Sequence, residues 1–149
     1  MAQNRRARHD YEILETVECG IALVGSEVKS IREGKVQLKD SYARIDGGEV
    51  WLFGVHVSPY AFAHGRDGHD PERPRKLLLH RREIDHLAAR TRQEPLTMVP
   101  LSVYFKEGRA KVELALARGR KLYDKRRAIA ERDYEREVER AAARGRRDG

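Results

Sequence analysis

Apolar and polar residues alternate in short runs along the middle of the chain, a pattern that is typical of β-strands. Residues 11–23 are rich in β-branched and aromatic side chains without helical spacing, which predicts one curved strand with Gly20 as a bend or bulge. Residues 42–45 and 49–57 flank the tripeptide at 46–48, Asp-Gly-Gly, whose glycines suit the positive backbone angles of a tight turn. These two segments therefore predict a first β-hairpin.

Helical spacing of apolar residues occurs in two places. Ser26 is a candidate N-cap and Gly34 a candidate C-cap, so a short helix of about two turns is expected between them. A longer amphipathic helix is predicted over residues 81–92. Its apolar positions at helical spacing are Ile84, Leu87, Ala88 and Thr91.

A second hairpin is predicted near the end of this region. Alternating apolar residues in 101–105 and 112–116 flank the turn segment 106–109. Short antiparallel strands interrupted by helices, without β-α-β alternation, favour a closed sheet. We therefore expect a mainly β fold: an OB-type antiparallel barrel of about six strands over residues 11–118, with two or three short helices.

Positive charge is concentrated at the two ends of the chain, which has 149 residues and a formal net charge of +7. Three arginines against one aspartate give residues 1–10 a charge of +2, and eleven basic against seven acidic residues give residues 119–149 a charge of +4. A nearly neutral body with cationic ends favours binding to a polyanion, because phosphate neutralisation releases counterions. Basic ends that only keep the protein in solution are the plain alternative.

The segment 119–149 has too few apolar residues to fold by burial alone, so we interpret it as a basic tail after a basic N-terminal arm, residues 1–10. Arginines repeat every four residues along the tail and would repel one another on one side of a helix. We expect the tail to be disordered when free and helical when a polyanion surrounds it. Its thirty-one residues would then be about 45 Å long.

Side chains with catalytic or metal-binding chemistry are sparse. Cys19 is the single cysteine, which excludes an internal disulfide and a multi-cysteine zinc site. His64, Asp67, His69 and Asp70 lie in a polar loop, where such residues are more often hydrated than metal-bound. No glycine-rich phosphate motif accompanies a strand and a lysine. We expect no enzyme activity, cofactor or metal.

Targeting and membrane signals are also lacking in the sequence. No run approaches the roughly twenty apolar residues of a membrane span, and the first residues lack the apolar segment of a secretory signal. These features predict a cytoplasmic protein without membrane contact, and we expect a monomer.

Four blocks of sequence in a fixed order resemble a known family. The blocks are Asn4-Arg5-Arg6-Ala7-Arg8-His9-Asp10-Tyr11, Gly25-Ser26-Glu27-Val28-Lys29-Ser30-Ile31-Arg32, Arg75-Lys76-Leu77-Leu78-Leu79-His80, and Ala117-Arg118-Gly119-Arg120-Lys121 followed by Asp124-Lys125-Arg126. Each block is weak alone, but together they closely resemble the SmpB family, the tmRNA-binding small protein B of bacterial trans-translation. The resemblance is continuous from about Asn4 to Arg127.

The resemblance implies a noncatalytic adaptor with a six-stranded OB-type barrel that binds the tRNA-like domain of tmRNA. It implies that the protein replaces the missing anticodon arm and helps to deliver alanyl-tmRNA, with elongation factor Tu, to stalled ribosomes. The RNA-binding positions that it implies, with Lys121 added as a phosphate donor, are Glu18, Leu78, His80, Gly119, Lys121, Asp124, Lys125 and Arg126.

The resemblance also implies where the two ends of the chain lie on the ribosome. His9 matches a position that faces the decoding centre, and Tyr11 is included with it because both rings can stack on unstacked bases. The tail would be helical in the vacant downstream mRNA channel, against chiefly small-subunit RNA. The tail residues expected to bind there are Arg132, Tyr134, Arg136, Arg140 and Arg144.

Individual residues allow simple chemical interpretations. Glu18 can accept hydrogen bonds from base amino groups or orient a neighbouring arginine. Leu78 and His80 point the same way in an extended chain, so an apolar contact would lie beside a hydrogen-bonding ring. Buried packing is the alternative for that pair. Gly119 would allow a backbone turn where the tail departs.

Two other functions remain open at this stage. A ribosomal or assembly protein would bind ribosomal RNA permanently, and a small nuclease would use His9 or His80. Selective binding of one tRNA-like RNA would favour the adaptor over the ribosomal or assembly protein. Cleavage of that RNA would favour the nuclease.

Overall fold

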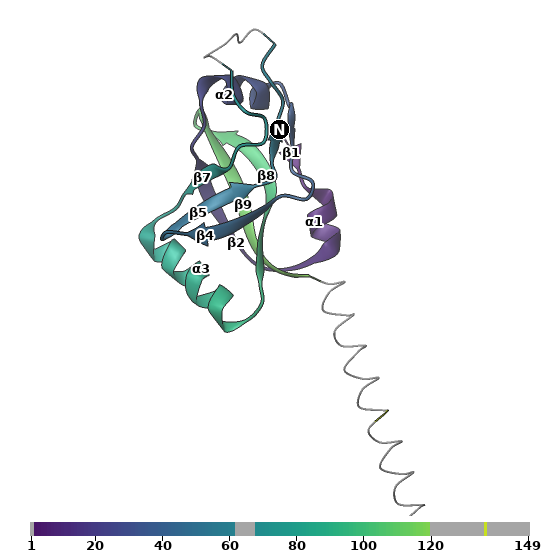
Figure 1. Ribbon diagram of the computed structural model, residues 1–149, viewed down its shortest axis with the longest axis vertical. Helices are drawn as coiled ribbons and strands as arrows, with labels where there is room; N and C mark the ends of the chain where they lie inside the picture. The colour runs from purple at the N-terminus through teal and green to yellow at the C-terminus, as the bar shows by residue number, and fades with distance from the viewer. Residues whose placement is uncertain (1, 62–67, 120–135, 137–149) are drawn as a thin grey trace, which may run out of the picture.

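The computed structural model describes residues 2–61, 68–119 and 136, and within them the chain is mainly β (Figure 1). The helices are α1 Arg5–Asp10, α2 Gly25–Arg32 and α3 Arg81–Gln93. The strands are β1 Ala2–Gln3, β2 Tyr11–Ile21, β3 Val36–Gln37, β4 Tyr42–Asp46, β5 Glu49–Phe53, β6 His56–Val57, β7 Arg75–Leu78, β8 Thr97–Lys106 and β9 Arg109–Gly119. No helix in the described part is long and apolar enough to cross a membrane.

Antiparallel pairings close six of the strands into a ring. The order around the ring is β8, β4, β5, β7, β2 and β9, and β9 pairs with β8 to complete it. β1 pairs with β8, while β3 and β6 form a separate two-stranded sheet. The sequence prediction of a mainly β, antiparallel fold with short helices is confirmed at this level.

The hydrophobic core lies inside the ring, because alternate residues of each strand point inward. On β5, for example, Val50 and Leu52 are buried whereas Trp51 and Phe53 are only partly covered. A second, smaller cluster lies beneath α1. Its buried members are Ala7, Val99, Leu101, Ala115 and Ala117.

Both predicted hairpins are present, and both turn through residues with positive φ. Gly47 and Gly48, with φ of 60° and 77°, connect β4 to β5. Glu107 and Gly108, with φ of 52° and 78°, connect β8 to β9. Two consecutive positive φ values match the twist of the flanking strands. The predicted helix over residues 81–92 is also present, as α3.

The long strand β2 is irregular at a different place from the one that the sequence suggested. Its register against β9 shifts between Ile13 and Glu15, not at Gly20. Gly20 instead pairs with Lys111 of β9 on one side and Leu78 of β7 on the other. It therefore lies where β2 and β7 approach closely, which a side chain would hinder.

The first ten residues contain two elements that the sequence analysis did not predict, β1 and α1. Asn4 is buried and joins them to the ring: its side-chain amide donates to the Pro100 carbonyl at 2.9 Å, and its amide oxygen accepts from the Ala7 N–H at 3.1 Å. Hydropathy alone gave no sign of this segment's structure because its contacts are mainly polar and long-range.

The start of α2 also differs from the expectation. Val24, not Ser26, occupies the N-cap position, and the Glu27 carboxylate accepts a hydrogen bond from the Val24 N–H at 2.9 Å. Glu27 is fully buried and also binds Arg73 and Arg75, each at 2.5 Å. This ionic cluster connects α2 to the chain that leads into β7.

Candidate functional site

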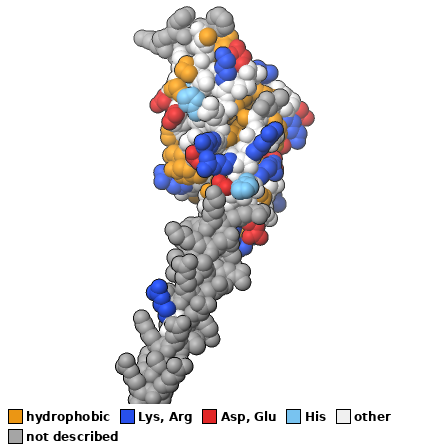
Figure 2. All heavy atoms as spheres, turned by 90° about the vertical axis from the view of Figure 1, so that its right-hand side faces the viewer, with side chains coloured by type: hydrophobic (Ala, Val, Ile, Leu, Met, Phe, Trp, Pro, Cys, Tyr) orange, Lys and Arg blue, Asp and Glu red, His pale blue; other side chains and the backbone are white. Residues whose placement is uncertain are grey.

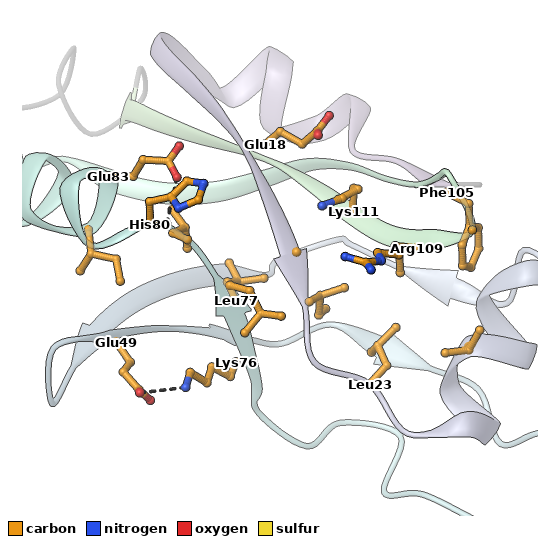
Figure 3. A pocket seen from close by; sticks show the side chains of 18 of the residues that line it. Glu18, Leu23, Glu49, Lys76, Leu77, His80, Glu83, Phe105, Arg109 and Lys111 are labelled. Atoms are coloured by element: carbon orange, nitrogen blue, oxygen red, sulfur yellow. Dashed lines mark hydrogen bonds and ion pairs between the residues drawn. The ribbon is translucent and has the colours of Figure 1, made fainter.

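A groove of about 810 Å³ runs across β2, β7 and the start of β9. Figure 3 shows His80 and Glu83 near the beginning of α3 at one end and Phe105 at the other, with Arg109 and Lys111 between them. Glu18, Leu78 and His80, all sequence-predicted RNA-binding residues, line this groove. The fold thus brings Glu18 together with Leu78 and His80, which lie 60 and 62 positions later in the sequence.

Glu18 presents an ionised carboxylate at the groove. It accepts hydrogen bonds from the Tyr104 hydroxyl at 2.5 Å and the Lys106 ammonium at 3.5 Å. The bond from Tyr104, aided by the charge of Lys106, lowers the pKa of Glu18 below its ordinary value. Burial and the bond to Glu18 raise the pKa of Tyr104 to about 12. The carboxylate is therefore an acceptor suited to base amino groups at neutral pH.

Leu78 and His80 lie at the end of β7 and at the N-cap of α3. Leu78 is an unusually exposed apolar residue, with 51% of its surface accessible, so it is not a core residue. The His80 ring is exposed as well, and its backbone N–H donates to the Glu83 carboxylate at 3.0 Å. An apolar surface beside a hydrogen-bonding ring is a suitable contact for an unpaired base.

Four cationic side chains surround these residues, and the sequence analysis did not identify them. Lys76 pairs with Glu49 at 2.8 Å, and the Arg81 guanidinium donates to the Gly48 carbonyl at 3.0 Å. Within the described part of the chain, Arg109 and Lys111 form no ion pair, which leaves both suited to phosphate. Their position follows from the pairing of Lys111 with Gly20, which local patterns do not reveal.

Three other candidates, His9, Tyr11 and Gly119, lie at the opposite end of β2. Tyr11 pairs directly with Gly119, the last residue of β9, and His9 precedes them at the end of α1 with 82% of its side chain exposed. Glu18 follows Tyr11 by seven positions, or roughly 23 Å of extended strand. Gly119 is thus beside the expected decoding-centre residues, not in the groove with Glu18.

The face that carries α1 displays basic side chains interleaved with hydrophobic ones (Figure 2). The three arginines of α1 are exposed; Arg6 contacts Asp10 at 3.4 Å and Arg8 contacts Glu113 at 3.5 Å. These pairs are on the surface, where such interactions contribute little to stability. The arginines can therefore exchange their partners for phosphates at small cost.

One of the tail candidates lies within the described residues. Arg136 is described as an exposed residue in a helical conformation. The others lie outside the described residues: Lys121, Asp124, Lys125, Arg126, Arg132, Tyr134, Arg140 and Arg144.

His69, one of the four polar-loop residues with metal-binding side chains, makes structural hydrogen bonds. Its Nε2 donates to the Val57 carbonyl at 2.9 Å, so its Nδ1 accepts from the Ser26 hydroxyl at 2.7 Å. His64 and Asp67 lie outside the described residues. Across the described ranges, no group of three or more His, Cys, Asp and Glu is arranged to hold a metal.

Comparisons with known proteins agree with one another. The family model described as SmpB protein matches residues 1–144. An SsrA-binding protein of Desulforudis audaxviator is 61% identical over 142 residues, covering 95% of this chain and 92% of that protein. One from Carboxydothermus hydrogenoformans is 57% identical over 141 residues, covering 95% and 94%.

A solved structure is also similar. It is described as "tmRNA-SmpB: a journey to the center of the bacterial ribosome" and has a TM-score of 0.66 to this chain, with 54% sequence identity. The match covers 79% of this chain and 82% of that one. Sequence and structure comparisons therefore point to the same family.

Proposed function

The chain belongs to the SmpB family, and we propose that it is a noncatalytic RNA-binding adaptor that captures the tRNA-like domain of tmRNA and delivers it to stalled ribosomes for trans-translation. The observation that carries this proposal is the groove in which Glu18, Leu78 and His80 converge. Leu78 and His80 belong to one block of sequence, and Glu18 lies sixty positions before Leu78. Their convergence is what a single RNA contact site requires.

The groove has the chemistry for an RNA loop. Glu18 provides an acceptor, Leu78 an apolar surface, and His80 a ring that can stack or donate a hydrogen bond. Arg109 and Lys111 lie beside them and can neutralise phosphates, which binding to any RNA requires. The set contains base-contacting and phosphate-contacting groups in one place, which supports recognition of a folded RNA.

The proposal also assigns roles to the ring of strands, the N-terminal arm and the tail. The ring of strands is an OB-type barrel over residues 11–118, the arm 1–10 and the tail 119–149 act on the ribosome, and the protein works in the cytoplasm. The tail, disordered when free, becomes helical against small-subunit RNA. Elongation factor Tu is an indirect partner through alanyl-tmRNA.

The groove is tested by removing the exposed apolar contact, with Leu78→Ala in the full chain. Because Leu78 is half exposed, its loss should leave the midpoint of thermal unfolding nearly unchanged. Affinity for a transcribed tRNA-like domain, measured by gel shift, should fall roughly tenfold. The substitution removes about three methylene equivalents, and only the exposed half of Leu78 is newly buried on binding, which leaves about 1.2 kcal/mol.

The matched control is Val24→Ala, another exposed apolar residue with 45% of its surface accessible, which does not line the groove. It should bind the tRNA-like domain like the unmodified chain. Equal affinity of Leu78→Ala and the unmodified chain would contradict the assignment of the groove. Cleavage of the RNA during the assay would contradict the noncatalytic role.

A further inference from the structure

The outer face of β4, β5 and β7 carries a row of aromatic and cationic side chains, of which only Lys76 also lines the groove. The row, here called the aromatic strip, consists of Tyr42, Arg44, Trp51, Phe53 and Lys76. Its members are cross-strand neighbours: Tyr42 pairs with Phe53, Arg44 with Trp51, and Trp51 with Lys76. In Figure 1 the three strands lie side by side.

The rings of the strip are held in a defined arrangement. Tyr42 stacks on Phe53 with ring centroids 5.5 Å apart and an angle of 20° between the rings. The Arg44 guanidinium lies over the Phe53 ring, 4.6 Å from its centroid. Flat groups are therefore already stacked in the free protein, which reduces the entropy lost when another flat group is added.

The strip is not needed for the core. The residues that alternate with it, Ala43, Val50 and Leu52, are buried, whereas Tyr42 has 42% of its surface accessible. The solvated face of an antiparallel sheet is ordinarily polar. Three aromatic residues on such a face indicate a binding surface.

The charges on this face favour stacking over phosphate binding. Lys76 is paired with Glu49 at 2.8 Å, and Asp46 offsets Arg44 on the same hairpin, so the face is close to neutral. Aromatic and guanidinium planes on a neutral surface suit the faces of unpaired bases, which stack without sequence readout.

The strip continues at both ends into surfaces already described. Lys76 lines the groove, and Tyr42 lines a separate hollow of about 280 Å³ together with Tyr11 and Arg6. Tyr42 is the most exposed ring of the strip, and it lines this hollow together with Tyr11, an expected contact of the decoding centre. The strip meets the groove through Lys76, a cation already paired with Glu49, whereas the exposed Tyr42 ring meets the hollow beside Tyr11, so stacking favours ribosomal RNA over the RNA held in the groove.

We propose that the aromatic strip stacks unpaired bases of small-subunit ribosomal RNA, extending the contact made by His9 and Tyr11 across β4 and β5. This inference rests on the proposed function, because it takes the ribosome as the destination of the chain. It assigns a binding role to Tyr42, Arg44 and Phe53, which neither the sequence analysis nor the groove includes.

The experiment compares the full chain with Tyr42→Ala in sedimentation with vacant small ribosomal subunits, and in gel shift with the tRNA-like domain. Tyr42→Ala should weaken binding to small subunits fivefold or more, taking about 1–3 kcal/mol for one lost stacking contact. Its affinity for the tRNA-like domain should be unchanged. The control Tyr60→Ala removes a partly exposed ring outside the strip, beside Lys29, and should match the full chain in both assays.

A second measurement needs no variant, because Trp51 is the chain's single tryptophan. An unpaired adenosine hexanucleotide should quench its fluorescence, whereas a base-paired RNA of equal length should not. Normal binding of Tyr42→Ala to small subunits, weakened binding to the tRNA-like domain instead, or the absence of quenching would overturn the inference. Failure of the unmodified chain to bind either RNA would overturn the proposed function itself.

Discussion

Gly20 shows how a single missing side chain shapes the groove. An added Cβ at this position would lie 3.2 Å from the Leu78 Cβ, closer than ordinary van der Waals contact, and 3.4 Å from its Cδ1. The φ of Gly20 is not positive, so steric space and not backbone strain requires glycine here. The position of Leu78 in the groove therefore depends on the absence of a side chain on β2.

Replacing Gly20 with alanine should displace Leu78 and weaken RNA binding. We expect Gly20→Ala to lower the free energy of unfolding by about 1 kcal/mol, measured by urea denaturation, because the end of β7 must shift slightly. Its affinity for the tRNA-like domain should fall several-fold in a gel shift.

Gly25→Ala is the matched control, since nothing lies within 4 Å of an added Cβ and its φ is not positive. Its stability should stay within about 0.5 kcal/mol of the original, and its RNA affinity should not change. Equal RNA affinity for the two glycine variants would show that Leu78 does not depend on Gly20.

At the scale of elements, local patterns predicted the hairpins and α3, because turn glycines and helical spacing are encoded within a few residues. The ionic cluster of Glu27, Arg73 and Arg75 was not predictable in this way, because its members are 46 and 48 residues apart. Arg75 is fully buried, although a charged residue in a sequence is ordinarily assigned to the surface.

The cluster should be essential to the attachment of α2 to β7. In Glu27→Gln the buried Arg75 loses its charge partner, so the free energy of unfolding, measured by urea denaturation, should fall by about 3–5 kcal/mol. The control is Glu33→Gln, which breaks an exposed contact of 3.2 Å with Lys35 and should cost less than about 1 kcal/mol. Equal losses for the two variants would contradict this role.

The same cluster should make stability depend on pH. Burial alone would raise the pKa of Glu27, but hydrogen bonds from Arg73, the Val24 N–H and Arg75 outweigh it and lower the pKa. A carboxyl with a lowered pKa in the folded state adds stability above its unfolded value of about 4.3, and this stability is lost as pH falls further. The original chain should therefore lose stability in acid more steeply than Glu27→Gln.

At the scale of the molecule, the expected site residues separate into two surfaces at opposite ends of β2. Glu18, Leu78 and His80 share the groove, while His9, Tyr11 and Gly119 lie together at the other end. The sequence resemblance supplied the residues, but it could not supply this division, because strand register and ring closure are set by long-range pairing. The cationic residues Arg109 and Lys111 were missed for the same reason.

This arrangement suggests a division of labour between capture and rescue. We expect the groove to hold the RNA near one end of β2, whereas Gly119, the last residue of β9, pairs with Tyr11 at the other end. Removal of the distal tail should then leave the groove intact. It should affect only the steps that take place on the ribosome.

The most direct test of this account is deletion of residues 128–149, with RNA capture and ribosome rescue measured on the same truncated chain. We predict that affinity for the tRNA-like domain stays within about twofold of the full chain, because the groove and Asp124, Lys125 and Arg126 remain, while tagging on stalled ribosomes is abolished. Parallel loss of capture and rescue, or rescue that continues without the tail, would contradict it.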